Sequence, residues 1–211
     1  DAAAVSAGNS SWQLGYAGFL VPKVFLQAYP LTGRDEYLIG ARDFILGWLD
    51  FESNSWIPVG FLWNDHSIAS RGSILSNFWE AYRRHPLYDP KAGAKILKLA
   101  RLTADNLARP SLYTFRTNHG TMQSLALAKL SLYFPSLENF EGYGQLAIDR
   151  LLEQLKYFFS QQKIVNEHSV GYHAFGLVLL DNTRLLSSMI RGTVPAELNA
   201  IFKRAVDFLG S

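Results

Sequence analysis

The sequence predicts an all-α protein whose helices form an irregular ring of antiparallel neighbours. Apolar residues recur at three- and four-residue steps along most of the chain, which is the period of one helix face. Strict alternation of apolar and polar residues, the pattern of half-buried strands, is short and rare. The links between the helical segments are short, so we expect successive helices to run antiparallel.

The apolar period indicates about eight helices, separated by segments that contain Pro, Gly or Ser. The predicted helices are Phe19–Tyr29, Tyr37–Leu49, Ile68–Tyr82, Ala92–Ala108, Thr121–Tyr133, Tyr143–Phe159, Tyr172–Met189 and Ala196–Leu209. Pro30 and Gly33 end the first helix, and Asp35 and Glu36 open the next with acidic side chains near its positive end.

The composition favours one globular domain over residues 1–211. Hydrophobic residues make up 48% of the chain and charged residues only 18%, so a sizeable core can form. Broad apolar faces, as in Leu151–Phe159, suit helices that pack on two neighbours in a ring or solenoid. No repeat of fixed period is visible, so an irregular helical toroid is favoured over a regular solenoid.

Charge and cysteine content exclude several classes of function. Lys plus Arg number 20 and Asp plus Glu number 18, with no basic block, so we expect no nucleic-acid partner. No apolar run reaches about 18 residues, so no membrane span is expected. Cysteine is absent, which excludes disulfides, thiolate zinc sites and cysteine nucleophiles.

Three polar segments interrupt the apolar pattern, each at or near the start of a predicted helix. They are Trp63–Arg71, Arg116–Gly120 and Asn166–His173. Four of the five histidines lie in them, namely His66, His119, His168 and His173. If these helix starts lie along one rim of a helical ring, the three segments meet around its mouth.

Each segment also has a purely structural interpretation, which the residues leave open. Asn118, Asp65 and Ser169 are residue types that cap helix N-termini. The other structural interpretations are a surface hydrogen bond for His66 or His168, an ion pair for Arg71 and a wedge between helices for Trp63. Tyr172 and His173 are harder to explain in this way, because both are costly to bury unpaired.

Together the segments suit removal of a proton from a carbon next to a carboxylate. An amide and an imidazole bonded to that carboxylate withdraw its charge and stabilise the enolate-like intermediate, and Asn118 and His119 are donors of these two types. A base must lie within hydrogen-bond reach of the acidic carbon, and Tyr172 fits this role where nearby positive charge favours its phenolate. His173 could assist either proton transfer.

The same segments resemble a known enzyme family. Residues 118–120 read Asn-His-Gly, and residues 167–173, after a helix, read Glu-x-Ser-x-x-Tyr-His. This order resembles the heparinase II/III-like polysaccharide lyases and the related alginate and oligoalginate lyases. Residues 63–71 read Trp-x-Asp-His-x-x-x-x-Arg and look like the upstream segment of the same group.

The resemblance implies an (α/α) toroid, incomplete here because fewer helices are predicted than in a full ring. It implies β-elimination on uronic-acid polysaccharides, with no metal and no cofactor required. By position, Asn118 and His119 correspond to the carboxylate-neutralising pair and Tyr172 to the catalytic tyrosine, with His173 beside it. The residues expected to bind substrate are Trp63, His66, Arg71, Arg116 and Glu167, since a guanidinium pairs well with carboxylate or sulfate.

The resemblance also implies an acidic polysaccharide or oligosaccharide as partner and a periplasmic or secreted location. Relatives usually continue into a large β-sandwich domain that contributes a further catalytic His or Tyr. The sequence is helical in character up to Ser211, so we expect that domain to lie outside this chain.

Two other functions stay open at this point. An α/α-barrel glycoside hydrolase needs paired carboxylates, and Asp65 and Glu167 are the acidic residues inside the polar segments. This alternative ranks second because it gives the Asn-His and Tyr-His pairs no task. A non-catalytic domain could instead bind acidic glycans through Arg71, Arg116 and Trp63.

Overall fold

The computed structural model is helical throughout the part of the chain that it describes, residues 9–53, 62–159 and 170–209. The elements are α2 (Ser10–Ala17), α3 (Leu20–Thr32), α4 (Asp35–Ser53), α5 (Asp65–Tyr82), α6 (Pro90–Ala108), the 3₁₀ turn η1 (Pro110–Leu112), α7 (Asn118–Tyr133), α8 (Phe140–Phe158), α9 (Val170–Arg191) and α10 (Ala196–Leu209). None of these helices is both long and apolar enough to cross a bilayer. The all-α prediction is confirmed.

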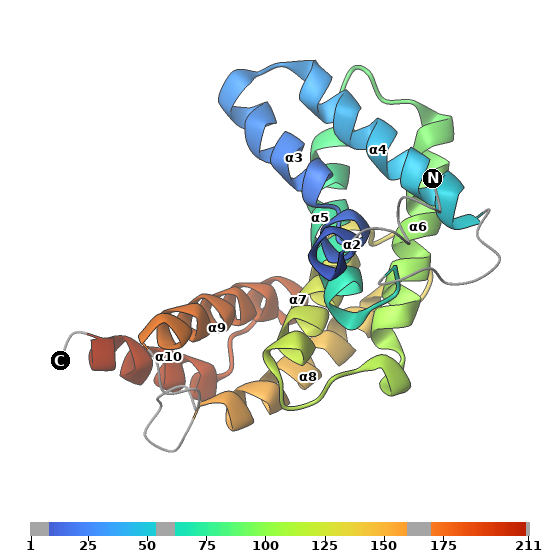
Figure 1. Cartoon of the computed structure of the whole chain (residues 1–211). Helices are drawn as coiled ribbons and strands as arrows, with labels where there is room; N and C mark the ends of the chain where they lie inside the picture. The colour runs from blue at the N-terminus through green and yellow to red at the C-terminus, as the bar shows by residue number, and fades with distance from the viewer. Residues whose placement is uncertain (1–8, 54–61, 160–169, 210–211) are drawn as a thin grey trace.

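Neighbouring helices pair as hairpins around an open curve. α3 packs on α4, α5 on both α6 and α7, α7 on α8, and α9 on α10. Figure 1 shows α5 and α7 at the centre, with α3 and α4 on one side and α9 and α10 on the other. The curve does not close into a ring, so the predicted incomplete toroid of antiparallel helical hairpins is confirmed.

Several helices begin earlier than the apolar period predicts. α5 begins at Asp65 instead of Ile68, α7 at Asn118 instead of Thr121, and α8 at Phe140 instead of Tyr143. In α5 and α7 the first turn consists mainly of polar residues, which an apolar pattern does not register. α2 was not predicted at all, because eight residues are too short for the period to stand out.

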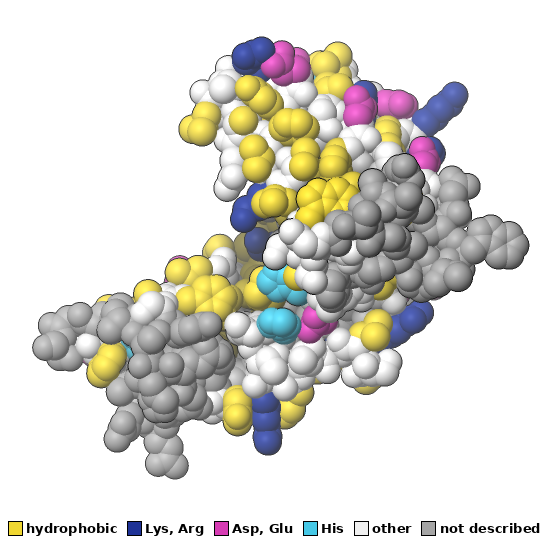
Figure 2. Space-filling view, in the orientation of Figure 1, with side chains coloured by type: hydrophobic (Ala, Val, Ile, Leu, Met, Phe, Trp, Pro, Cys, Tyr) yellow, Lys and Arg dark blue, Asp and Glu magenta, His cyan; other side chains and the backbone are white. Residues whose placement is uncertain are grey.

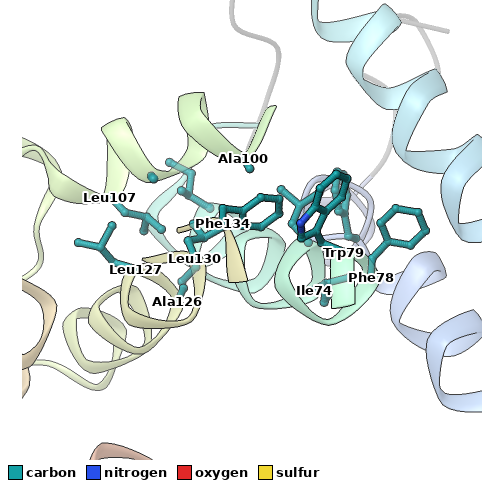
Figure 3. Packing of buried hydrophobic residues seen from close by; sticks show 14 of the residues in the cluster. Ile74, Phe78, Trp79, Ala100, Leu107, Ala126, Leu127, Leu130 and Phe134 are labelled. Carbon is teal, nitrogen blue, oxygen red and sulfur yellow. The ribbon is translucent and has the colours of Figure 1, made fainter. Parts of the chain in front are cut away.

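The central helices are held together by one large core, part of which Figure 3 shows. Trp79 of α5 stacks on Phe134, just after α7, with ring centroids 5.3 Å apart. Gly72 lets α5 and α7 approach closely, since a Cβ there would lie 3.2 Å from Leu130 and 3.3 Å from Ala126. This packing fixes the start of α5 relative to the start of α7.

Candidate functional site

The first turns of α5 and α7 meet at the surface. Asn64 caps α5, with its Oδ1 accepting from the His66 N–H at 3.0 Å, and Thr117 caps α7, with its Oγ1 accepting from the Gly120 N–H at 3.1 Å. The rings of His66 and His119 lie side by side, with centroids 5.5 Å apart and their planes tilted by 55°. The structure therefore brings the first two polar segments together.

Asn118 is the first residue of α7 and does not cap it. Thr117 provides the cap, so the structural interpretation of Asn118 as the N-cap is wrong. The side-chain amide of Asn118 has no hydrogen-bond partner among the described residues, and the residue is half-buried beside His119. The amide is therefore available to a molecule that approaches the start of α7.

Asp65 is the centre of a hydrogen-bond network that orients His119. Its Oδ2 accepts from the Thr114 hydroxyl and lies 3.0 Å from His119 Nδ1, while its Oδ1 accepts from the His66 N–H at 2.8 Å. Burial opposes ionisation of Asp65, but the hydrogen bonds from His119, Thr114 and His66 outweigh it and hold the pKa of Asp65 below its ordinary value.

The network decides which nitrogen of His119 faces outward. An ionised carboxylate only accepts hydrogen bonds, so Nδ1 of His119 carries the hydrogen that points to Asp65. No described residue bonds Nε2, and 43% of the His119 side chain is exposed. Nε2 is therefore the ring atom that can meet a ligand.

Two buried glutamines hold the loop that precedes α7. Gln123 accepts from the Thr114 N–H at 3.0 Å and donates to the Leu112 carbonyl at 2.7 Å. Gln154 of α8 accepts from the Arg116 N–H at 2.9 Å. Sequence analysis missed both glutamines and Thr114, although a lone amide on an otherwise apolar helix face is a signal that could have found the glutamines.

Gly120 is required by this loop. A Cβ at Gly120 would collide with the carbonyl oxygen of Thr114 and with the side-chain amide of Gln154. The glycine of the Asn-His-Gly tripeptide therefore lets the loop lie against the first turn of α7, where Thr114 reaches Asp65.

Arg116 lies in the same loop and stays at the surface. Its backbone has a φ of 61°, in the left-handed region. Its guanidinium lies over the rings of Phe115 and Tyr157, 5.1 and 5.2 Å from their centroids. Arg116 is thus an exposed cation close to the start of α7, as a substrate-binding role requires.

Arg71 lies in the interior, so the expectation that it holds an anionic group of a substrate is wrong for this structure. Its side chain has no exposed surface and lies against both Trp48 and Trp63, 4.3 and 4.4 Å from their ring centroids. It donates to the carbonyl oxygens of Ala17 and Leu62 at 3.1 and 2.9 Å. Burial lowers the pKa of Arg71 to about 9. Trp63 is half-buried and serves this interior contact.

The third polar segment is described only in part. Glu167 and His168 lie outside the described residues, and Tyr172 is described only as part of the first turn of α9. The His173 ring is buried between α9 and α10, where its Nε2 lies 2.8 Å from the Ala205 carbonyl oxygen and Phe208 packs on it. The structure therefore places His173 inside the helical hairpin and not with His66 and His119.

A cavity of about 340 Å³ lies beside His66, between α2, α3 and the first turns of α5. His66, Ser70 and Lys23 are among its lining residues. Figure 2 shows the histidine patch at the edge of a hollow in this face, with Lys and Arg side chains on the adjoining wall. Within the described ranges, no group of three His, Asp or Glu side chains lies close enough together to hold a metal ion.

Comparison with solved structures gives the fold family. A crystal structure of a heparinase III superposes with a TM-score of 0.72 at 17% identity, over 88% of this chain and 28% of that one. The heparan sulfate lyase HepC from Pedobacter heparinus gives 0.78 at 15% identity, over 97% of this chain and 32% of that one. At these identities the likeness establishes the fold, and the chain spans about a third of the length of these structures.

Comparison of the sequence itself is more specific. No protein of a curated set matches the chain. The model of the heparinase II/III N-terminus matches residues 6–209, which is nearly the whole chain. The chain therefore belongs to the heparinase II/III N-terminal domain family.

Proposed function

We propose that this chain is the helical domain of a polysaccharide lyase that cleaves uronic-acid polysaccharides by β-elimination. One observation carries the proposal: the uncommitted amide of Asn118 stands next to His119, whose ring is oriented by Asp65 so that Nε2 faces outward. An amide and an imidazole side by side are the donors that a sugar carboxylate needs when the adjacent carbon loses its proton.

His119 works as an imidazolium in this proposal. With Nδ1 bonded to Asp65, its Nε2–H donates to one oxygen of the uronate carboxylate while the Asn118 amide donates to that group as well. The ionised Asp65 fixes the orientation of the ring, and the N-terminus of α7 adds a partial positive charge that attracts the substrate carboxylate. The substrate carboxylate is thereby neutralised, which makes the hydrogen on C5 acidic enough to remove.

Tyr172 is the base and then the acid. As a phenolate it takes the C5 proton, the C5–H electron pair becomes the C4=C5 double bond, and the C4–O bond breaks. The leaving glycosidic oxygen then takes the proton from the Tyr172 phenol. α9 packs on α7, and Phe175 of α9 lines the same cavity as Met122 of α7. The burial of His173 supports a packing role, so we leave it out of the proton transfers.

The substrate class follows from the relatives and from the site. The similar structures are a heparinase III and a heparan sulfate lyase, so we propose a heparan-type or alginate-type chain bearing carboxylates. Such substrates favour a periplasmic or secreted protein. His66 and the exposed Arg116 are the proposed contacts nearest to the carboxylate-binding pair.

The test is the ultraviolet absorbance of the unsaturated uronate, measured with the intact protein and with both polysaccharides. Asn118→Ala and Tyr172→Phe should each abolish most of the absorbance rise. Tyr37→Phe, on α4 away from this site, is the matched control and should keep it. Full turnover by Asn118→Ala and Tyr172→Phe would contradict the roles proposed.

The geometry disfavours the glycoside hydrolase. A hydrolase would need one carboxyl group that holds a proton for the leaving oxygen. Asp65 accepts three hydrogen bonds, and these hold its pKa low, so it stays ionised and committed to His119. A hydrolase would also release product without the new double bond, so the same assay separates the two functions.

A further inference from the structure

Three cavities form one continuous groove that begins at His66. The first, of about 340 Å³, and the second, of about 290 Å³, share Ser70 and Lys23 in their linings. The third, of about 360 Å³, shares Lys23, Ile74 and Asn77 with the second. Lys23 of α3 therefore stands where all three cavities join, and α5 forms the floor of the groove along its length.

The lining of this groove suits an acidic saccharide. Among the described residues, no Asp or Glu lines any of the three cavities, whereas Lys23 lines all three and Lys129 lines the second. Serine and asparagine side chains offer hydrogen bonds to hydroxyl groups, and apolar side chains offer flat surface to sugar rings; these are Ser70, Ser73, Asn77, Asn182, Ile74, Leu125 and Phe175. Figure 2 shows the face hollowed here, with basic side chains beside the histidine patch.

Lys129 is the most informative residue in the groove. It lies on α7, half-buried, and burial lowers the pKa of its ammonium group. No described carboxylate lies within ion-pair distance of it, so its desolvation is not offset by the part of the protein described here. An anion bound in the groove would offset that cost.

The spacing indicates the size of the occupant. Lys129 lies ten residues after His119 on the same helix, which is about 15 Å at the α-helical rise. A single sugar cannot reach both ends of this distance, whereas an extended oligosaccharide can.

We propose that this groove is the binding site for an extended acidic oligosaccharide, with Lys23 and Lys129 holding its carboxylate or sulfate groups beyond the bond that is cleaved. The proposal rests on the proposed lyase function for the identity of the chain in the groove. The two lysines take the role that the sequence analysis gave to Arg71, which is buried, of holding the substrate's charged groups.

The test is direct binding, which needs no turnover. Dissociation constants are measured for the intact protein carrying Asn118→Ala, with a sulfated heparan-type oligosaccharide and with an alginate oligosaccharide that carries only carboxylates. Lys23→Met and Lys129→Met should each weaken binding about tenfold and reduce the salt dependence of the affinity by about one charge. If the lysine variants lose affinity for both ligands, the lysines recognise carboxylates. If they lose affinity for the sulfated ligand alone, the lysines recognise sulfates.

Lys98→Met is the matched control, because Lys98 is exposed on α6 and lines none of the three cavities. Lys129→Arg keeps the charge and should restore most of the affinity. Lys23 is exposed, so its variant tests the proposal even where Lys129→Met fails to fold. Binding by Lys23→Met and Lys129→Met that equals binding by Lys98→Met would overturn the proposal.

The two proposals fail in different ways. If the protein forms no unsaturated product but binds the oligosaccharide through the two lysines, the lyase function is wrong and the proposed role of the groove stands. If Asn118→Ala abolishes elimination while Lys23→Met and Lys129→Met change neither the dissociation constant nor KM, the lyase function stands and the proposed role of the groove is wrong.

Discussion

The described part of the chain contains two histidine–aspartate pairs whose surroundings differ. At the starts of α5 and α7, His119 bonds Asp65 through Nδ1 and leaves 43% of its side chain exposed. At the turn after α5, His85 bonds Asp35 through Nε2, only 9% of its side chain is exposed, and its Nδ1 accepts from the Leu87 N–H at 3.2 Å. Both nitrogens of His85 bond described residues, whereas only one nitrogen of His119 does.

The comparison shows that the partner alone does not give a histidine its role. His85 has a carboxylate partner, yet its ring joins the turn after α5 to the start of α4 and offers no free nitrogen. His119 has the same type of partner, which Thr114 and the His66 N–H fix in place, and its second nitrogen faces the surface. The second nitrogen therefore distinguishes a candidate catalytic histidine from a structural one.

The largest expected effect is on turnover by the intact protein. His119→Ala should lower kcat/KM by about 10²- to 10³-fold, because it removes a donor to the developing charge. His85→Ala should keep the activity and lower the free energy of unfolding by about 1 kcal/mol, the value of a typical hydrogen bond. Equal loss of activity in both variants would remove the distinction between the two pairs.

Substitution of Asp65 and Asp35 tests the same comparison between the two histidine–aspartate pairs. Asp65→Asn should lower kcat/KM by about 10- to 100-fold, as loss of an outer partner does at other sites, while Asp35→Asn leaves it unchanged. Without the carboxylate, Nδ1 of His119 loses the charged acceptor that orients the ring. An unchanged kcat/KM in Asp65→Asn would contradict this orienting role.

A stability comparison tests the loop that positions Thr114. Gly120→Ala should lower the free energy of unfolding by about 2 kcal/mol, because its Cβ meets the backbone of Thr114 and the amide of Gln154. Gly47→Ala, on the exposed face of α4 with open space around it, should raise stability by about 0.5–1 kcal/mol. Urea unfolding of both variants measures this difference. An unchanged free energy of unfolding in Gly120→Ala would show that the loop can move away from the added Cβ at little cost.

The smallest effect is the acid dependence of stability. The pKa of Asp65 is lower in the folded protein than in the unfolded chain, where it is about 3.9. The ionised Asp65 therefore contributes its full share to the free energy of unfolding above that pH. The contribution is lost as the pH falls through the folded pKa. The difference in unfolding free energy between wild type and Asp65→Asn should therefore be larger at neutral pH than in strong acid, and a constant difference would contradict the network.

The apolar period was sufficient for the fold and for part of the site. It predicted the helices other than α2, and the position of the polar segments at helix starts predicted the meeting of His66 and His119. It could not predict the N-caps Asn64 and Thr117. The first turns of α5 and α7 consist mainly of polar residues, so the apolar period does not show where these helices begin.

Partners distant in the sequence explain the rest. Arg71 is held by Trp48, Trp63 and the Ala17 carbonyl, and no local pattern distinguishes such an arginine from an exposed one. The carbonyl that bonds His173 belongs to Ala205, 32 residues further along the chain. Lys129 was also missed, although a lysine within the apolar run after Leu125 was a readable signal.

Histidine nitrogen NMR of the Tyr172→Phe protein, which should bind without turnover, tests the central claim most directly. Addition of a uronate oligosaccharide should shift the Nε2 resonance of His119, which meets the substrate carboxylate, and leave both nitrogen resonances of His85 unchanged. An unchanged His119 in the presence of saturating oligosaccharide would contradict its role as the partner of the substrate carboxylate.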